Sequence, residues 1–382
     1  MKKVELTCLE TKTILEGNWF VTSHLCSGDG RIIFSCSSFK ESKSNYYSAD
    51  GGKTWRKIDD VMERFHFTLL SDGSVLGFSM NNEIKDKIPK NQYKKPYILG
   101  VRRAASFDDL LQGNFEDDFV RADIPDLGAG NGDMGQEFGG VCDHGIVELP
   151  NGNILLTMYG FFHEDKTPID PAIKRMNYQY RSWVIVSHDR AKSFSYLSTV
   201  ADVQTYSDVK VAEGYCEPDL KLLDNGNLIC LTRTGGQRRK ELFTPLYSSL
   251  SKDGGKTWSA PNYVYQHGVF PKIEQTQNSA VVVASGREGV FLCASADGGE
   301  TWQEPVFASE TFASRTGDFW CCSSAYSCIA EIAPNELLLI YDDIDDTKEY
   351  PFPDPQANVK PTMVDFENCH KVIAKRYSVK II

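Results

Sequence analysis

Short runs of alternating apolar and polar residues fill most of the chain, and Asn-Gly or Asp-Gly pairs separate them. Residues 142–159 align without a gap on residues 216–233, and each copy predicts a strand, an Asn-Gly turn and a second strand. Four further copies, of which the last two are looser, cover residues 64–78, 326–341, 19–36 and 269–284. The pattern therefore predicts six β-hairpins.

A second repeat follows most of these hairpins. The eight residues Ser251–Trp258 recur as Ser48–Trp55 and Ser295–Trp302, with a worn copy at Ser187–Phe194. The Asp-Gly-Gly core supplies the positive φ angles of a tight turn, and the Asp and Thr side chains can bond its amides. Repeats on this scale are typical of stacked or radial arrays of small sheets.

This eight-residue segment is the Asp-box (BNR) repeat, so the chain resembles the sialidase-type β-propellers. With six inner hairpins, we expect an all-β, six-bladed β-propeller formed by residues 1–382 as a single domain. Blade two has only a vague outer hairpin, around Arg103–Asp108. A terminal strand, Val372–Ile382 or Val4–Leu9, is expected to pair with the other end of the chain and remove a free sheet edge.

The hydrophobic content and net charge of the chain exclude some classes of binding partner. A hydrophobic content of 41% supports a packed core, and a formal charge of −11 argues against nucleic-acid and polybasic membrane surfaces. The first residues lack a signal peptide and no run reaches membrane length, so we expect a cytoplasmic protein, or a secreted one if a leader was removed.

The cysteine and histidine pattern gives no sign of a cofactor. The eleven cysteines form an odd set without framework spacing, which favours buried free thiols over disulfides. No Cys and His spacing is typical of zinc, and we expect neither a metal nor an organic cofactor.

Candidate chemistry comes from aligning the hairpins. In a propeller the first residue of each inner hairpin faces one central funnel, so the aligned positions should converge. They are Phe20 or Trp19, Arg64, Asp143, Glu217, Val269 or Phe270, and Tyr326. Ionisable groups at four of six such positions are costly unless they are paired or used.

The resemblance implies roles for some of these residues. Sialidases use a Tyr nucleophile with a Glu partner, an Asp acid/base, and three Arg residues that hold the sugar carboxylate. Here Glu217 and Arg233 resemble the Glu and the second Arg, Arg287 the third Arg, and Tyr326 the nucleophile. A neutral phenol avoids the repulsion that a carboxylate nucleophile would meet from an anionic sugar.

Two positions depart from the family pattern. The segment Asn18–Val21 has no Arg where the first Arg belongs, and Ser37–Asn45 has no Asp where the acid/base belongs. Arg64 is the candidate replacement for the Arg. The candidates for the acid are Asp143 and His144, and second-rank candidates on adjoining segments are Gln136, Glu137, Arg181 and Arg238.

Three functions follow. The first is an exo-acting glycoside hydrolase that cleaves a terminal, acidic sugar from a glycan. The second is another enzyme on the same fold, either an inverting hydrolase using Asp143 and Glu217 or a uronate lyase using His144 and Tyr326. The third is a non-catalytic carbohydrate-binding propeller. In each case the partner is a glycan or small sugar, and the oligomeric state stays open.

Overall fold

The computed structural model describes most of the chain and is almost entirely β. The described residues are 2–38, 44–62, 65–79, 97–128, 140–168, 178–207, 211, 213–235, 245–286, 289–309, 323–344 and 370–382. They form strands β1 to β24 and one five-residue helix. None of the helical residues in these ranges makes a segment long and apolar enough to cross a membrane.

The described residues divide into two compact units. The first unit comprises Met1–Glu63 and His267–Ile382, and the second comprises Arg64–Gln266. The expectation of a single domain over residues 1–382 stays a prediction.

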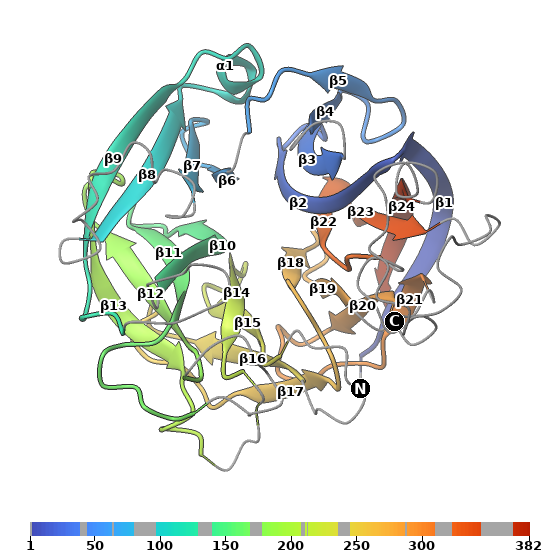
Figure 1. The fold of residues 1–382 in the computed structure, drawn as a ribbon. Coiled ribbons are helices and arrows are strands. Elements are labelled where there is room, and N and C mark those ends of the chain that lie inside the picture. The colour runs from blue at the N-terminus through green and yellow to red at the C-terminus, as the bar shows by residue number, and fades with distance from the viewer. Residues whose placement is uncertain are drawn as a thin grey trace, which may run out of the picture. The chain divides into compact units, whose positions relative to one another are not determined.

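Three four-stranded sheets make up the first unit (Figure 1). One sheet runs in the order β2 (Asn18–Cys26), β3 (Ile32–Ser38), β4 (Ser44–Ser48) and β5 (Arg56–Ile58). The next contains β18 (Lys272–Gln275), β19 (Val281–Gly286), β20 (Val290–Ser295) and β21 (Val306–Ser309). The third contains β22 (Ser327–Ala333), β23 (Glu336–Ile344), β24 (His370–Ile381) and β1 (Val4–Glu16).

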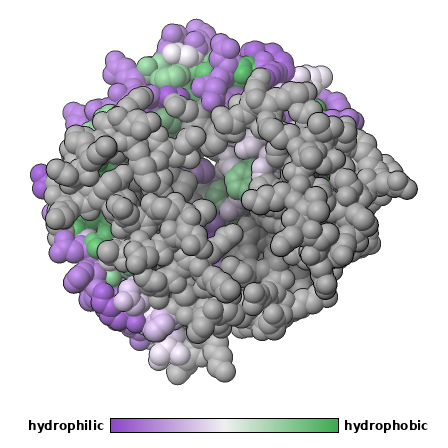
Figure 2. All heavy atoms as spheres, viewed as in Figure 1, coloured by the Kyte–Doolittle hydropathy of each residue, from purple (hydrophilic) through white to green (hydrophobic). Residues whose placement is uncertain are grey.

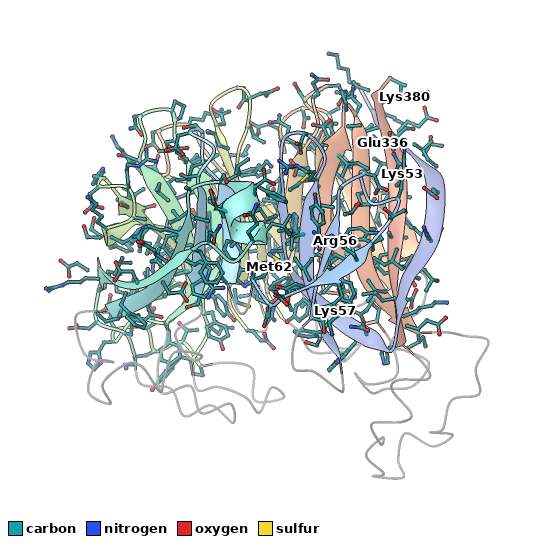
Figure 3. All side chains as sticks on the ribbon, turned by 90° about the horizontal axis from the view of Figure 1, so that it is seen from above. Lys53, Arg56, Lys57, Met62, Glu336 and Lys380 are labelled. Carbon is teal, nitrogen blue, oxygen red and sulfur yellow. The ribbon has the colours of Figure 1, made fainter. Side chains whose placement is uncertain are left out.

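The predicted pairing of the two terminal strands is confirmed in the first unit. Strand β1 runs antiparallel to β24, from Val4 opposite Ile381 to Glu16 opposite Lys371, and the two lie side by side in Figure 1. Strand β1 thereby covers the hydrogen-bonding edge that β24 would otherwise expose. On the other side of β24, Arg376 pairs with Glu336 of β23, which is labelled in Figure 3.

The second unit holds a four-stranded and an eight-stranded sheet. The first contains β14 (Cys216–Leu222), β15 (Leu228–Arg233), β16 (Leu246–Ser251) and β17 (Asn262–Tyr265). The larger one joins β10 (Gly140–Glu148), β11 (Ile154–Gly160), β12 (Arg181–Ser187) and β13 (Ser193–Ala201) to β9 (Glu116–Asp123), β8 (Tyr97–Ala104), β7 (Val75–Ser79) and β6 (Phe65–Leu69).

The join between these two sets of four strands was not predicted. Strands β13 and β9 pair in parallel, with Ser193 opposite Arg121. The vague outer hairpin expected around Arg103–Asp108 is the β8–β9 pair, and helix α1 (Phe107–Leu111) connects its strands. Ser106 caps this helix by accepting a hydrogen bond from the Asp109 amide.

The Asp boxes act as turn devices, as predicted. In the copy that follows β4, the Ser48 hydroxyl accepts the Gly52 amide at 2.8 Å and the Thr54 hydroxyl donates to Asp50 at 2.6 Å. Trp55 closes the turn by donating from its indole nitrogen to the Gly52 carbonyl at 3.0 Å. The Ser and Thr bonds recur around Asp253 and Asp297. The indole nitrogen of Trp258 instead donates to the Ser198 hydroxyl at 3.0 Å.

Each unit buries its own apolar side chains between sheets. In the second unit Trp183, Phe78 and Leu99 are fully buried in one cluster, and in the first unit Leu338 and Phe34 share another. The buried Met62, labelled in Figure 3, is fixed by its amide bond to Asn45 of β4. Coloured residues at the periphery of Figure 2 are mostly hydrophilic. Large hydrophobic side chains exposed within the described ranges are Leu9, Phe119, Tyr263, Val306 and Ile382.

Candidate active site

The first strands of four sheets share an unusual backbone conformation at or just before their start. Phe20, Glu217, Phe270 and Ala325 have positive φ angles of 58°, 46°, 45° and 65°. The register of β2 breaks between Trp19 and Val21, and that of β14 breaks between Cys216 and Asp219. A positive φ costs a non-glycine residue about 1 kcal/mol, and such strain gathers at functional sites.

These angles support the sequence alignment of the hairpins, with one correction. Phe20, Glu217 and Phe270 occupy the aligned positions, but in the β22 sheet the corresponding residue is Ala325 and not Tyr326. Tyr326 is thus one residue later than predicted.

The second unit places three charged side chains in one buried cluster, which we call the Arg233 triad: Glu213, Glu217 and Arg233. Arg233 donates to both carboxylate oxygens of Glu217, from Nε at 2.5 Å and from Nη2 at 3.0 Å. Its Nη1 donates to Glu213 Oε2 at 2.6 Å. The exposed fractions of the three residues are 6%, 7% and 9% in chain order, so the ion pairs are largely shielded from water.

The electrostatics around this triad follow from burial and from the two carboxylates. Burial alone would lower the pKa of Arg233, but the negative charges of Glu217 and Glu213 raise it well above its ordinary value. Burial also raises the pKa of the neighbouring Tyr180, and the negative charge of Glu213 adds to this effect. Tyr180 is therefore a neutral phenol next to a permanently charged guanidinium.

The backbone explains how Glu213 reaches Arg233. The Glu213 amide donates to the Thr234 carbonyl at 2.8 Å, one residue after Arg233, and the Tyr180 amide donates to the Glu213 carbonyl at 2.8 Å. Gly214 has a φ of 83°, and a Cβ there would lie 2.3 Å from the Tyr180 carbonyl oxygen. The close approach of these segments therefore requires glycine.

Strand β10, which carries Asp143 and His144, is held against β14 in the same unit. The Thr157 hydroxyl of β11 accepts the Gly145 amide and donates to the Pro218 carbonyl, both at 3.1 Å. A Cβ on Gly145 would lie 2.7 Å from the Leu220 amide, so the two strands pack at backbone distance. The side chains of Asp143 and His144 themselves lie outside the described part of the structure.

In the first unit Tyr326 belongs to an aromatic cluster. Its ring contacts Phe20 edge-on, with centroids 4.3 Å apart, and Phe270, with centroids 4.2 Å apart. Lys272 Nζ lies 4.7 Å from the Phe270 ring centroid. Tyr326 is half-buried, so its ring is packed while part of its surface stays open.

Asp342 is a buried carboxylate beneath this cluster that the sequence alignment did not single out. Its oxygens accept the Phe20 amide at 3.2 Å, the Ser324 amide at 2.8 Å and the Ser324 hydroxyl. Burial raises the pKa of Asp342 to about 6, against the opposing effect of these hydrogen bonds. The residue thus fixes the strained starts of β2 and β22. The only sequence signal was a polar residue ending a Leu-rich strand.

Arg181 has its guanidinium committed elsewhere in the second unit. It pairs with Asp165 through two nitrogens, donates to Thr199 at 3.1 Å, and stacks over Phe162 at 4.5 Å. These contacts give it a structural role, and substrate binding by Arg181 stays a prediction that this geometry does not favour.

The remaining predicted residues cannot be placed. Arg64, Arg287, Gln136, Glu137 and Arg238 lie outside the described residues. Where side chains are described, no group of three or more His, Cys, Asp or Glu is arranged to hold a metal ion. The seven cysteines whose side chains are described are free thiols, and five of them are buried.

Comparison with protein families gives two matches. Residues 138–360 match the model of the BNR repeat-like domain, and residues 46–57 match that of the BNR/Asp-box repeat. No curated protein sequence matches the chain significantly.

Solved structures with the same fold include enzymes. A Dyadobacter fermentans protein of unknown function is 17% identical, with a TM-score of 0.62 over 98% of this chain and 99% of its own. The Fusarium graminearum GH93 α-L-arabinofuranosidase, solved with arabinobiose, is 14% identical, with a TM-score of 0.55 over 96% and 97%. A Hadza microbial sialidase is 13% identical, with a TM-score of 0.53 over 85% of this chain and 63% of its own. These likenesses establish the fold, a six-bladed sialidase-like β-propeller.

Proposed function

The chain belongs to the BNR repeat-like family, and on this premise we propose that it is an exo-acting glycoside hydrolase that removes a terminal sugar from a glycan. The observation that carries the proposal is the Arg233 triad, in which a strained Glu217 holds its carboxylate in a buried ion pair. Buried ionisable clusters at strained backbone positions are typical of catalytic centres. The fold is one that glycosidases use.

The proposed mechanism retains configuration at the anomeric carbon. Glu217 accepts the phenolic proton of Tyr326, and the phenolate oxygen attacks the anomeric carbon. The glycosidic bond breaks as Asp143, or His144 in its place, protonates the leaving oxygen. Water, deprotonated by the same group, then displaces Tyr326, which regains its proton from Glu217. Arg233 orients the Glu217 carboxylate through two N–H bonds.

A second candidate uses two carboxylates without a tyrosine nucleophile. The close packing of β10 on β14 favours it, because these neighbouring strands of one unit carry Asp143 and Glu217. In this inverting version one carboxyl group protonates the leaving oxygen. The other takes a proton from the water molecule that attacks the anomeric carbon. Tyr326 then contributes only to sugar binding.

Two substitutions test the proposal on the full chain. With a panel of fluorogenic glycosides, Glu217→Gln should lower kcat by about 100-fold to 10,000-fold. Tyr326→Phe should lower it by about 1,000-fold or more in the first mechanism and only slightly in the second. Tyr341→Phe is the matched control, because it removes a buried tyrosine hydroxyl that bonds the Ala308 carbonyl in the same unit. A wild-type protein that binds glycans but hydrolyses none would instead be a carbohydrate-binding propeller.

A further inference from the structure

The charge of the Arg233 triad bears on which sugar the protein accepts. One guanidinium and two carboxylates give the cluster a formal net charge of −1, although an arginine alone would give +1. The raised pKa of Arg233 keeps the guanidinium charged, so the balance is set by the two acids. At an enclosed position such charges are weakly screened by salt.

Hydrogen-bonding geometry points in the same direction. An arginine clamps a carboxylate best through two parallel N–H bonds. In Arg233 the edge formed by Nε and Nη2 is already used by Glu217, and Nη1 is bonded to Glu213. A carboxylate on the sugar would have to share this guanidinium with two protein carboxylates, and all three would repel one another.

The first unit has aromatic rings where the sialidase pattern has an arginine. Phe20 occupies that segment, and its ring packs against Tyr326 in the cluster with Phe270. Aromatic surfaces suit the apolar C–H face of an uncharged sugar. The cation near this cluster among the described residues is Lys272, which is itself buried against Phe270.

We propose that the terminal sugar carries no carboxylate and that Glu213 determines this preference by offsetting the charge of Arg233. The inference rests on the proposed glycosidase function and differs from the sequence expectation of an acidic sugar. Glu213 contacts Arg233 and not the reacting atoms. Its proposed role is therefore to determine which sugar binds, and not to take part in the reaction.

The test compares neutral and acidic substrates on the wild-type protein. Methylumbelliferyl glycosides of neutral pentoses and hexoses are assayed beside a sialoside and a glucuronide. We expect kcat/KM for the best neutral substrate to exceed that for either acidic one by at least about 100-fold. A preference for an acidic substrate would overturn the inference and leave the glycosidase proposal standing.

If no substrate is turned over, the glycosidase proposal fails but the charge preference can still be measured. Saturation-transfer NMR with free galactose, arabinose, N-acetylneuraminic acid and glucuronic acid reports binding without catalysis. Stronger binding of an acidic sugar contradicts the inference. The ratio of acidic to neutral binding should change little with ionic strength, because salt screens an enclosed charge only weakly.

The variant Glu213→Gln tests the contribution of the Glu213 charge to the sugar preference. It keeps the side-chain shape and removes one negative charge, so the ratio of acidic to neutral kcat/KM should rise by about tenfold or more. The matched control is Asp117→Asn, which removes a carboxylate from another buried arginine, Arg102, in the same unit. The control should leave the ratio unchanged. An unchanged ratio in folded Glu213→Gln would also remove Glu213 from the proposal, and the wild-type comparison of neutral with acidic substrates decides the sugar preference if the variant does not fold.

Discussion

At the scale of single residues, Asp342 shows how one buried side chain can hold a site together. Its carboxylate accepts bonds from Phe20 and Ser324, and so fixes the backbone on both sides of the Tyr326 ring. Asp342→Asn keeps the size but turns one acceptor oxygen into a donor facing the Ser324 amide or hydroxyl. We expect the free energy of unfolding to fall by about 2 kcal/mol, measured by chemical denaturation at pH 7.

The same residue predicts a pH dependence. The pKa of Asp342 is raised to about 6 in the folded protein by burial, whereas it is about 3.9 in an unfolded chain. The folded state therefore binds the proton more tightly, and stability should decrease as pH rises from about 4 to about 6. Asp342→Asn should lose this component, while Asp123→Asn, an exposed carboxyl on β9, should keep it. If the stability of Asp342→Asn depended on pH in the same way as that of the wild type, the assignment to Asp342 would be wrong.

Individual site residues could be predicted from the sequence where they fall in a repeated or family-like segment. Glu217 was found because its hairpin aligns with another, and Arg233 because the resemblance covers that segment. Glu213 was missed because it precedes β14 in a stretch without strand periodicity, and its partner lies 20 positions away. The role of Asp342 in holding two strand starts was not predicted, because its partner Phe20 lies 322 positions away in the sequence.

At the scale of elements, the hairpin turns depend on glycine for two separable reasons, which Gly52 of an Asp box and Gly73 of the β6–β7 turn illustrate. Gly52 and Gly73 have nearly equal φ angles of 83° and 85°, but a Cβ on Gly52 would lie 2.6 Å from Leu338 and one on Gly73 would meet nothing within 4 Å. Gly73→Ala should cost about 1 kcal/mol from backbone strain alone. Gly52→Ala should cost about 1–3 kcal/mol more because it overpacks the core. Equal losses on thermal denaturation would show that the Leu338 contact is unimportant.

The worn Asp box, Ser187–Phe194, keeps its turn through contacts that local sequence patterns do not predict. Arg190 and Ala191 stand where the other boxes have glycines, and they keep positive φ angles of 59° and 61°. Their segment is fixed by non-local contacts, because Arg190 pairs with Asp72 and the Ala191 carbonyl accepts from Arg103. Such contacts, like the parallel join of β13 to β9, leave no periodic signal in the sequence.

At the scale of the whole molecule, counting hairpins was sufficient to predict the blade number, since a hairpin is a local structure and each propeller blade begins with one. The pairing of the chain ends followed from a physical need, the covering of a free sheet edge, and not from any motif. That argument left the partner strand open between two candidates, and the structure uses both, as β1 and β24.

The β1–β24 pair therefore gives the prediction that tests the architecture most directly. Val4 packs in the same apolar cluster as Ile373 and Val379 of β24, so β1 adds core contacts as well as backbone hydrogen bonds. Deleting residues 1–16 should lower the melting temperature by at least about 10 °C and cause self-association through the exposed β24 edge, seen by light scattering. The substitution Leu9→Ser should change neither property, because Leu9 is 55% exposed and falls at a break in the β1 register. A synthetic peptide of residues 2–16 should reverse the self-association, because pairing with β24 requires only the strand and not its covalent link. A deletion variant that is as stable as the wild type and associates no further would show that the β24 edge does not need cover.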